Sequence, residues 1–283
     1  MRTLARILVV ALLVAGAALA GGPAHAAPVT GRSLKIMPLG DSITWGVGSS
    51  TTSSYRADLW RQLVAGAGLA VDFVGSGQSG SLPDTDNEGH SGWRIEQITA
   101  SIDGWLAAAQ PDVVLLHIGT NDMNQNFDVA GAPGRLGALL DRIAADMPSA
   151  TVVVAAIVPS TDATVNGRVN AFNAAVPGVV AQHANARFAD LNSTITAADM
   201  ADALHPSDAG YAKMASLWYS ALEGIVGGGR DWPLFRTGLE PGETAPTWTD
   251  TVDASVNVGG YNANLSKMET GPRAETAHGR PTH

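Results

Sequence analysis

Five short apolar runs, separated by segments with helical spacing, divide the central part of the chain. The runs occupy residues 34–39, 70–75, 113–118, 151–157 and 186–191. Between them, apolar residues recur every three or four positions, as at Ile95, Ile98, Ile102 and Leu106 and again at Leu136, Leu139, Ile143 and Met147. Apolar strands that alternate with amphipathic helices are typical of a parallel sheet with helices on both faces. The pattern therefore predicts an α/β fold with five parallel strands.

Two residues mark the later helices. Pro177 lies inside the fourth helical stretch, where its ring and its missing N–H predict a kink or a break. Ser207 precedes a last amphipathic segment, so we expect it to be the N-cap of the final helix. The apolar face of that helix is formed by Tyr211, Met214, Trp218 and Leu222.

The two ends of the chain differ in character from its middle. Residues 1–26 combine two arginines, a 14-residue apolar stretch and the small-residue sequence Ala24-His25-Ala26. This pattern predicts a secretory signal peptide and an exported, extracellular protein. Residues 227–283 are rich in Thr, Gly, Pro and Asn, which favours a linker followed by a truncated accessory module or a disordered end. We therefore expect one folded domain over residues 27–226.

Charge and cysteine content narrow the range of partners and chemistries. The formal net charge is −9, and loss of the predicted signal peptide leaves 15 basic and 26 acidic side chains, a formal charge of −11. Without a basic cluster, nucleic acid and anionic membranes are poor candidates as partners. The chain contains no cysteine, which excludes disulfides, thiolate metal sites and a cysteine nucleophile.

Polar clusters follow four of the apolar runs. Gly40-Asp41-Ser42 comes after the first run, and a long loop that reaches Gly92 follows the second. Gly119-Thr120-Asn121-Asp122 follows the third run, and the sequence DALHP, residues 202–206, lies about ten residues after the fifth. Loops at the carboxyl ends of parallel strands meet at one edge of the sheet, where ligands bind. These clusters are therefore expected to form one site.

The residue types in these clusters suit acyl transfer. A serine hydroxyl becomes an effective nucleophile when a base accepts its proton, and Ser42 and His205 are the candidates for these two roles. Asp202, three residues before His205, can hold the ring in the correct tautomer. The backbone N–H groups of Ser42 and Gly92 and the side-chain amide of Asn121 are candidate donors to an oxyanion.

The same four clusters resemble the sequence blocks of SGNH (GDSL-type) esterases. The matching segments are GDSITWG, the glycine of GHSGW, GTND and DALHP, in the family's order. The resemblance implies a flavodoxin-like three-layer α/β/α sandwich and assigns the serine, glycine, asparagine and histidine roles to Ser42, Gly92, Asn121 and His205. The segments SYRADLW, VDFVGS and LPDTDNEGHSGW are similar to family-three carbohydrate esterases, which remove acetyl groups from xylan. This second resemblance implies a serine esterase that acts on acylated carbohydrate without a cofactor.

Several residues near these blocks have two possible roles. Trp45 and Trp93 can stack against a sugar ring or pack to hold the loops. His90 lines the substrate pocket or orders the loop that contains it. Ser91 lies in GHSGW, which approaches the G-x-S-x-G pattern of another hydrolase class. We reject it as the nucleophile because Trp93 replaces the last glycine and because a polar stretch, rather than a strand, precedes it.

Three alternatives to the acetyl esterase remain. The substrate of the same enzyme can be a lipid or aryl ester. Asp41, Asp122, Asp202 and His205 can instead serve a metal-dependent phosphoesterase, although we expect Asp41 and Asp122 to hold turns and loops. The protein can also bind carbohydrate without catalysis, through residues 227–283. A nucleotide cofactor is not supported, because Gly46-Val47-Gly48 lacks a third glycine and no Walker motif occurs.

Overall fold

The structure is a computed structural model and describes residues 33–226. The predicted signal peptide and the segment 227–283 lie outside these residues. The strands are β1 (Leu34–Gly40), β2 (Val71–Phe73), β3 (Gly77–Gln78), β4 (Asp86–Gly89), β5 (Val113–His117), β6 (Thr151–Ala155) and β7 (Ala186–Ala189). The α-helices are α1 (Ser42–Trp45), α2 (Arg56–Trp60), α3 (Ile95–Ala109), α4 (Thr120–Asn124), α5 (Ala132–Asp146), α6 (Ala163–Val180) and α7 (Asp208–Val226). Three short helices complete the described chain: η1 (Arg61–Gly66), η2 (Val129–Gly131) and η3 (Ala197–Asp199).

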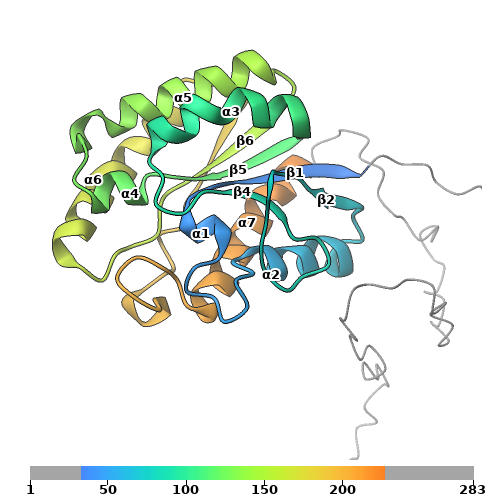
Figure 1. Ribbon diagram of the computed structural model, residues 1–283, viewed down its shortest axis with the longest axis horizontal. Coiled ribbons are helices and arrows are strands. Elements are labelled where there is room, and N and C mark those ends of the chain that lie inside the picture. Colours follow the sequence, from blue (N-terminus) through green and yellow to red (C-terminus); the bar gives the residue numbers. More distant parts are fainter. Residues whose placement is uncertain (1–32, 227–283) are drawn as a thin grey trace, which may run out of the picture. The chain divides into compact units, whose positions relative to one another are not determined.

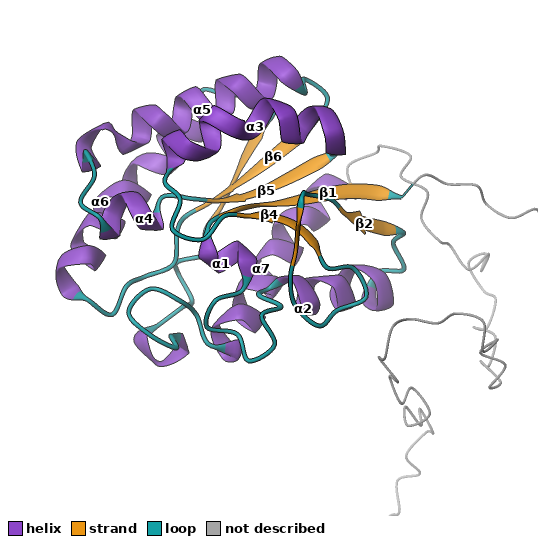
Figure 2. Ribbon diagram, in the orientation of Figure 1, coloured by secondary structure: helices purple, strands orange, loops and turns teal. Residues whose placement is uncertain are grey.

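The five predicted strands form the body of one parallel sheet (Figure 2). β1 pairs with β2 on one side and with β5 on the other, and β6 and β7 follow β5. Numbered as the five predicted strands, their order is 2-1-3-4-5, the flavodoxin-like doubly wound order. The predicted three-layer α/β/α sandwich is therefore confirmed.

Helices cover both faces of the sheet (Figure 1). Along β1, Ile36 faces one side, and Met37 and Leu39 face the other, as the two-residue period of a strand requires. The Met37 side packs against α3, α5 and α6, and the Ile36 side packs against α2 and α7. Each fully buried aliphatic side chain of this kind stabilises the fold by roughly 1.5–3 kcal/mol. Because many such side chains line both faces, apolar burial supplies the core without disulfides.

The sheet also has two short strands that the hydrophobic pattern did not predict. β4 pairs in parallel with the end of β1, where Gly40 lies opposite Gly89, and β3 pairs antiparallel with β4. β4 has the sequence DNEG and carries no apolar side chain, so an apolar run could not reveal it. β4 ends directly before His90, which makes one reason for rejecting Ser91 wrong: a strand does precede it.

The predicted start of α7 agrees with the structure, whereas the predicted break in α6 does not. α7 begins at Asp208, and the Ser207 hydroxyl accepts from the Gly210 N–H at 3.4 Å, which confirms Ser207 as the N-cap. α6 continues through Pro177 to Val180, so the predicted break is absent. Val176 and Val180 on either side are buried against the sheet, and this packing holds the helix through the proline.

Residues 33–226 contain no helix with the length and apolarity needed to cross a membrane.

Candidate active site

Ser42 lies at the point where β1 turns into α1. Asp41 is the N-cap of α1, and its Oδ1 accepts from the Ile43 N–H at 2.9 Å. Gly40 is required just before the turn, because a Cβ there would lie 2.2 Å from the His117 carbonyl oxygen. This arrangement places the Ser42 side chain, 8% exposed, at the first position of a helix.

Ser42, His205 and Asp202 form a continuous hydrogen-bonded chain. Ser42 Oγ lies 2.9 Å from His205 Nε2, across 163 residues of sequence. His205 Nδ1 lies 2.8 Å from Asp202 Oδ2 and 3.0 Å from Oδ1. With Nδ1–H donating to the carboxylate, Nε2 is left as the acceptor for the serine hydroxyl. The three side chains predicted from sequence therefore meet in the order that nucleophile activation requires.

The loop that carries His205 is fixed by its own backbone. Asp202 Oδ1 accepts from the N–H groups of Leu204 and His205, both at 2.8 Å, so the carboxylate folds the loop as well as contacting the ring. Met200 and Pro206 close the loop through a short antiparallel bridge, and the Ser160 hydroxyl donates to the Ala203 carbonyl at 2.7 Å. The imidazole consequently projects from a rigid turn.

Gly48 was missed by the sequence analysis, which considered it only as part of a nucleotide motif. Its φ is +90°, and a Cβ at this position would lie 2.9 Å from His205 Cβ and 2.5 Å from the Pro206 carbonyl oxygen. A side chain here would displace the histidine loop. Glycine at position 48 is therefore needed for the Ser42–His205 approach.

The Asp202 carboxylate is held in its charged form. Partial burial alone would raise the pKa of Asp202, but hydrogen bonds from the Leu204 N–H, the His205 ring and the His205 N–H outweigh it and lower the pKa. A charged carboxylate at this distance orients the His205 ring.

The loop of residues 90–93, named the oxyanion loop after the role predicted for Gly92, lies against the end of β1. The His90 N–H donates to the Gly40 carbonyl at 2.9 Å, which continues the β4–β1 ladder toward Ser42. Gly92 has φ +83°, a left-handed conformation that favours glycine. Within residues 33–226, the N–H groups of Ser42 and Gly92 donate no hydrogen bond. Both N–H groups are thus without a partner in the described part of the chain.

Asn121 links α4 to the other two site segments. Its Nδ2 donates to the Trp93 carbonyl at 3.0 Å and to Asp41 Oδ2 at 3.4 Å. To donate to an oxyanion, Asn121 would give up the longer contact, the one with Asp41. The neighbouring Asp122 accepts from the Ile95 N–H and pairs with Arg135 at 2.9 Å, so it holds a loop, as the sequence analysis expected.

Asp41 is fully buried beneath Ser42. Burial raises the pKa of Asp41 to about 7, against the lowering effect of the Ile43 N–H, and the charge of Asp122 adds to the rise. This folded-state pKa lies above the ordinary value of 3.8. The protonated Asp41 carboxyl therefore makes its full contribution to the free energy of unfolding below pH 4, and that contribution is lost as the pH rises to 7.

Asp41→Asn is expected to flatten the pH dependence of stability. Between pH 4.5 and 7, the free energy of unfolding should fall less steeply with pH in the variant, by up to about 1.4 kcal/mol per pH unit, since one proton is no longer exchanged. Urea unfolding at several pH values measures this difference. Identical slopes for both proteins would contradict a raised pKa at Asp41.

His90 and Trp93, which belong to the oxyanion loop, form an aromatic stack with Trp105 of α3. The His90 ring lies 4.5 Å from the Trp93 ring and 4.4 Å from the Trp105 ring. His90 Nε2 also contacts Glu88 Oε1 at 2.6 Å, and Glu88 is buried. These contacts favour loop ordering for His90 and Trp93.

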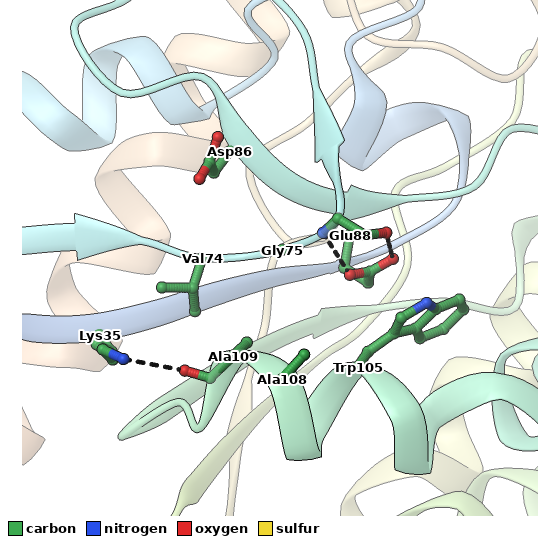
Figure 3. A pocket seen from close by; sticks show the side chains of 9 residues that line it. Lys35, Val74, Gly75, Asp86, Glu88, Trp105, Ala108 and Ala109 are labelled. Atoms are coloured by element: carbon green, nitrogen blue, oxygen red, sulfur yellow. Dashed lines mark hydrogen bonds between the residues drawn. The ribbon is translucent and has the colours of Figure 1, made fainter.

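Glu88 and Trp105 also line a pocket of about 250 Å³ between β4 and α3 (Figure 3). The residues that line it are Lys35, Val74, Gly75, Ser76, Asp86, Glu88, Trp105, Ala108 and Ala109. None of the predicted site residues is among them. The pocket is separate from the Ser42–His205 pair, and its polar groups are engaged: the Lys35 ammonium donates to the Ala109 carbonyl, and Glu88 accepts from Ser76.

Trp45 lies three residues after Ser42, at the end of α1, and is half-buried against β3 and β4. A Cβ at Gly89 would lie 2.5 Å from the Trp45 backbone nitrogen, and one at Gly77 would lie 3.1 Å from the Trp45 ring. Gly89 thus makes room for the backbone of Trp45 and Gly77 for its ring, and the ring contact favours packing as the role of this residue.

Arg56 is a buried residue that the sequence analysis quoted but assigned no role. Its guanidinium donates to the carbonyls of Thr44, Trp45, Thr52, Ser79 and Thr85. Burial lowers the pKa of Arg56 to about 10, which leaves it charged at neutral pH. Arg56 therefore binds the segment after Ser42 to the loop that leads into β4. A lone arginine in a helical stretch gives no sequence signal of this role.

The structure does not favour either Ser91 as the nucleophile or the metal-dependent phosphoesterase hypothesis. Ser91 is exposed, and no histidine among the described residues hydrogen-bonds to its hydroxyl. The four residues of the phosphoesterase reading do not converge, because Asp122 faces Arg135 whereas Asp202 faces His205. Residues 33–226 hold no group of three or more His, Asp or Glu side chains placed to bind a metal ion.

Comparison with known proteins agrees with this geometry. The profile of the GDSL-like Lipase/Acylhydrolase family matches residues 39–213. A multidomain esterase of Ruminococcus flavefaciens is 32% identical over 226 residues, which cover 69% of this chain and 29% of that protein. The chain spans less than two thirds of the length of the curated relatives it matches.

Solved structures give the same result. A family 3 carbohydrate esterase of Clostridium thermocellum is 40% identical, with a TM-score of 0.63 over 70% of this chain and 98% of that one. A carbohydrate esterase family 3 structure from Talaromyces cellulolyticus is 31% identical, with a TM-score of 0.62 over 70% of this chain and all of that one. The chain thus belongs to the GDSL-like lipase/acylhydrolase family, and family 3 carbohydrate esterases are among its structural neighbours.

Proposed function

We propose that this protein is a serine esterase that removes short acyl groups, chiefly acetyl, from a polysaccharide such as xylan. The observation that carries the proposal is the 2.9 Å approach of Ser42 Oγ to His205 Nε2, with Asp202 2.8 Å from the other ring nitrogen. Family membership supports the reaction class, and the family 3 neighbours support the substrate class.

The reaction proceeds in two halves. Ser42 Oγ forms a bond to the ester carbonyl carbon while His205 Nε2 takes the serine proton, and the carbonyl oxygen becomes an oxyanion. The carbon–alkoxy bond then breaks, and His205 returns the proton to the departing sugar hydroxyl. A water molecule, deprotonated by His205, releases the acyl group from Ser42 and restores the serine hydroxyl.

The oxyanion is stabilised by the Ser42 and Gly92 N–H groups together with the Asn121 amide. Each such donor is typically worth roughly 3–4 kcal/mol of transition-state stabilisation. The donors lie on α1, the oxyanion loop and α4, which the Asn121–Trp93 and His90–Gly40 hydrogen bonds hold together. The Ser42 and Gly92 N–H groups need no change of partner when charge develops, whereas Asn121 exchanges its 3.4 Å contact with Asp41 for the oxyanion.

The small amount of exposed apolar surface among the described residues supports a short acyl group. Among residues 33–226, the large apolar side chains that are exposed by more than a third are Val47, Phe127 and Phe188, on three separate segments. A long acyl chain needs a contiguous apolar surface to leave water. The described surface offers a better fit to acetyl than to a fatty acid.

The substrate proposal is tested by acetate release from acetylated xylan, set beside other acetylated polymers. A parallel assay compares p-nitrophenyl acetate with p-nitrophenyl palmitate. We expect release from xylan and a strong preference for the acetate ester. Preference for palmitate would favour the lipid-ester alternative. Polysaccharide binding without hydrolysis would favour the non-catalytic one.

Asn121→Ala should lower kcat for p-nitrophenyl acetate by about a hundredfold, because one oxyanion donor is lost. KM should change little, since the contact strengthens only in the transition state. Asn170→Ala, at an exposed asparagine of α6, is the matched control. An effect of less than twofold at Asn121 would remove it from the oxyanion hole.

We further propose that the protein is exported. Residues 1–26, with two arginines, an apolar stretch and Ala24-His25-Ala26, support this location. N-terminal sequencing of protein recovered from the culture medium is expected to begin at Ala27. Recovery of an intact N-terminus from the cell fraction alone would contradict export.

A further inference from the structure

Two consecutive carbonyls of the oxyanion loop are bound by amide side chains from α4 and its C-cap. The Trp93 carbonyl accepts from Asn121 Nδ2 at 3.0 Å, and the Gly92 carbonyl accepts from Gln125 Nε2 at 3.2 Å. Asn121 and Gln125 are four residues apart, so they lie one above the other on the same face of the helix. The first of these contacts belongs to the site already described, whereas the second involves a residue with no assigned role.

The orientation of the Gln125 amide is fixed by Arg94. Arg94 Nη1 donates to Gln125 Oε1 at 2.5 Å. A guanidinium has no acceptor, so the amide oxygen must face Arg94 and the amide nitrogen must face Gly92. Arg94 is itself held by Glu96 Oε1 at 2.7 Å and by the Phe127 ring, whose centre lies 4.2 Å from the guanidinium carbon. Gln125 therefore presents a preorganised donor to the Gly92 carbonyl.

The backbone at Gly92 needs such a hydrogen bond because glycine has no side chain to limit its conformation. Its φ of +83° is accessible to glycine together with many other conformations. A Cβ at this position would meet nothing within 4 Å, so close packing on that side does not hold the residue in place. The peptide that follows Gly92 is instead held at both ends: its oxygen accepts from Gln125, and the Trp93 N–H donates to the His90 carbonyl at 3.1 Å.

We propose that Gln125 is a positioning residue for the reaction: by binding the Gly92 carbonyl, it fixes the peptide after Gly92. This limits rotation about the Gly92 backbone and so keeps the Gly92 N–H, which belongs to the preceding peptide, directed toward the oxyanion that forms at Ser42. This inference rests on the proposed function. Gln125 is exposed, and its side chain contributes little to the core. Its removal should consequently affect catalysis more than stability.

The test compares Gln125→Met and Gln125→Glu with the unchanged protein on p-nitrophenyl acetate. Methionine keeps the length of the side chain but donates no hydrogen bond, and we expect kcat to fall about tenfold with KM within twofold. Glutamate keeps the acceptor for Arg94 but turns a carboxylate oxygen toward the Gly92 carbonyl, so its loss should be larger. Gln182→Met is the matched control, because Gln182 Nε2 also donates to a glycine carbonyl, that of Gly178 at 3.0 Å, away from the site.

A second readout separates positioning from general structure. A boronic acid that forms a tetrahedral adduct with Ser42 mimics the transition state, and its affinity should fall in Gln125→Met by the same factor as kcat/KM. The melting temperature should match that of Gln182→Met. A rise in KM with kcat unchanged would make Gln125 a substrate contact and overturn the proposal, as would turnover within twofold of the unchanged protein.

Failure of the proposed function gives a different result. If the unchanged protein neither hydrolyses p-nitrophenyl acetate nor reacts with a serine-directed phosphonate at Ser42, both proposals fall. If the unchanged protein does both and the Gln125 variants behave like Gln182→Met, the role of Gln125 alone is refuted.

Discussion

Ser42→Ala is expected to lower kcat for p-nitrophenyl acetate by about 10⁴-fold or more, because the acyl-enzyme can no longer form. The residual rate should reflect only binding and the oxyanion donors. The change removes one hydroxyl, whose contact is the 2.9 Å hydrogen bond to His205, and leaves the Asp41 cap of α1 in place. Thermal unfolding should therefore be nearly unchanged, and mass spectrometry should detect no phosphonate adduct in the variant.

Ser91→Ala provides the matched control for this prediction. Ser91 is exposed, lies two residues from Trp93 and is the rival nucleophile by sequence pattern. Its replacement should leave kcat within twofold. If Ser42→Ala unfolded the protein, Ser42 would be a structural turn residue instead. If Ser91→Ala abolished hydrolysis, the nucleophile would have been assigned to the wrong strand end.

His205→Ala should reduce kcat to a similar extent, since the serine hydroxyl then has no base. Asp202→Asn should cost roughly one to two orders of magnitude less, because the orienting carboxylate is the less critical partner. The fall in kcat is therefore expected to be larger in His205→Ala than in Asp202→Asn. Steady-state kinetics on p-nitrophenyl acetate measures both.

Imidazole rescue sharpens the test of His205. Added imidazole should restore part of the activity of His205→Ala, because it can take the proton of Ser42 in the space that the ring leaves. Addition of imidazole to Ser42→Ala should have no such effect. His183→Ala, at a histidine that contacts Asp141 and the Val179 carbonyl, is the control and should retain activity. Equal activity of the His205 and His183 variants would contradict the assignment of the base.

The positions of Ser42, Asn121 and His205 could be predicted from the sequence because they follow strands that apolar runs reveal. Parallel strands end at one edge of the sheet, so residues after those strands meet regardless of their separation along the chain. Asp202 could be predicted because it lies three residues from the base.

The support behind the oxyanion loop could not be predicted in the same way. β4 is polar, and it is held by backbone hydrogen bonds to β1 and by Glu88 and Asn87 rather than by apolar burial. Arg56 and Gln125 bind backbone carbonyls, and such contacts leave no period or spacing in the sequence. Pro177 does not break α6 for a related reason: local backbone preference favours a break, but burial of the neighbouring valines outweighs it.

The distance along the chain between Ser42 and His205 has a consequence for biosynthesis. The ribosome synthesises Ser42, Gly92 and Asn121 well before residues 202–205, and only α7 comes later among the described elements. Under the proposed chemistry, a nascent or prematurely terminated polypeptide that ends before Asp202 holds a serine without a proton acceptor. Hydrolytic competence would thus be acquired only when nearly all of the domain has been synthesised.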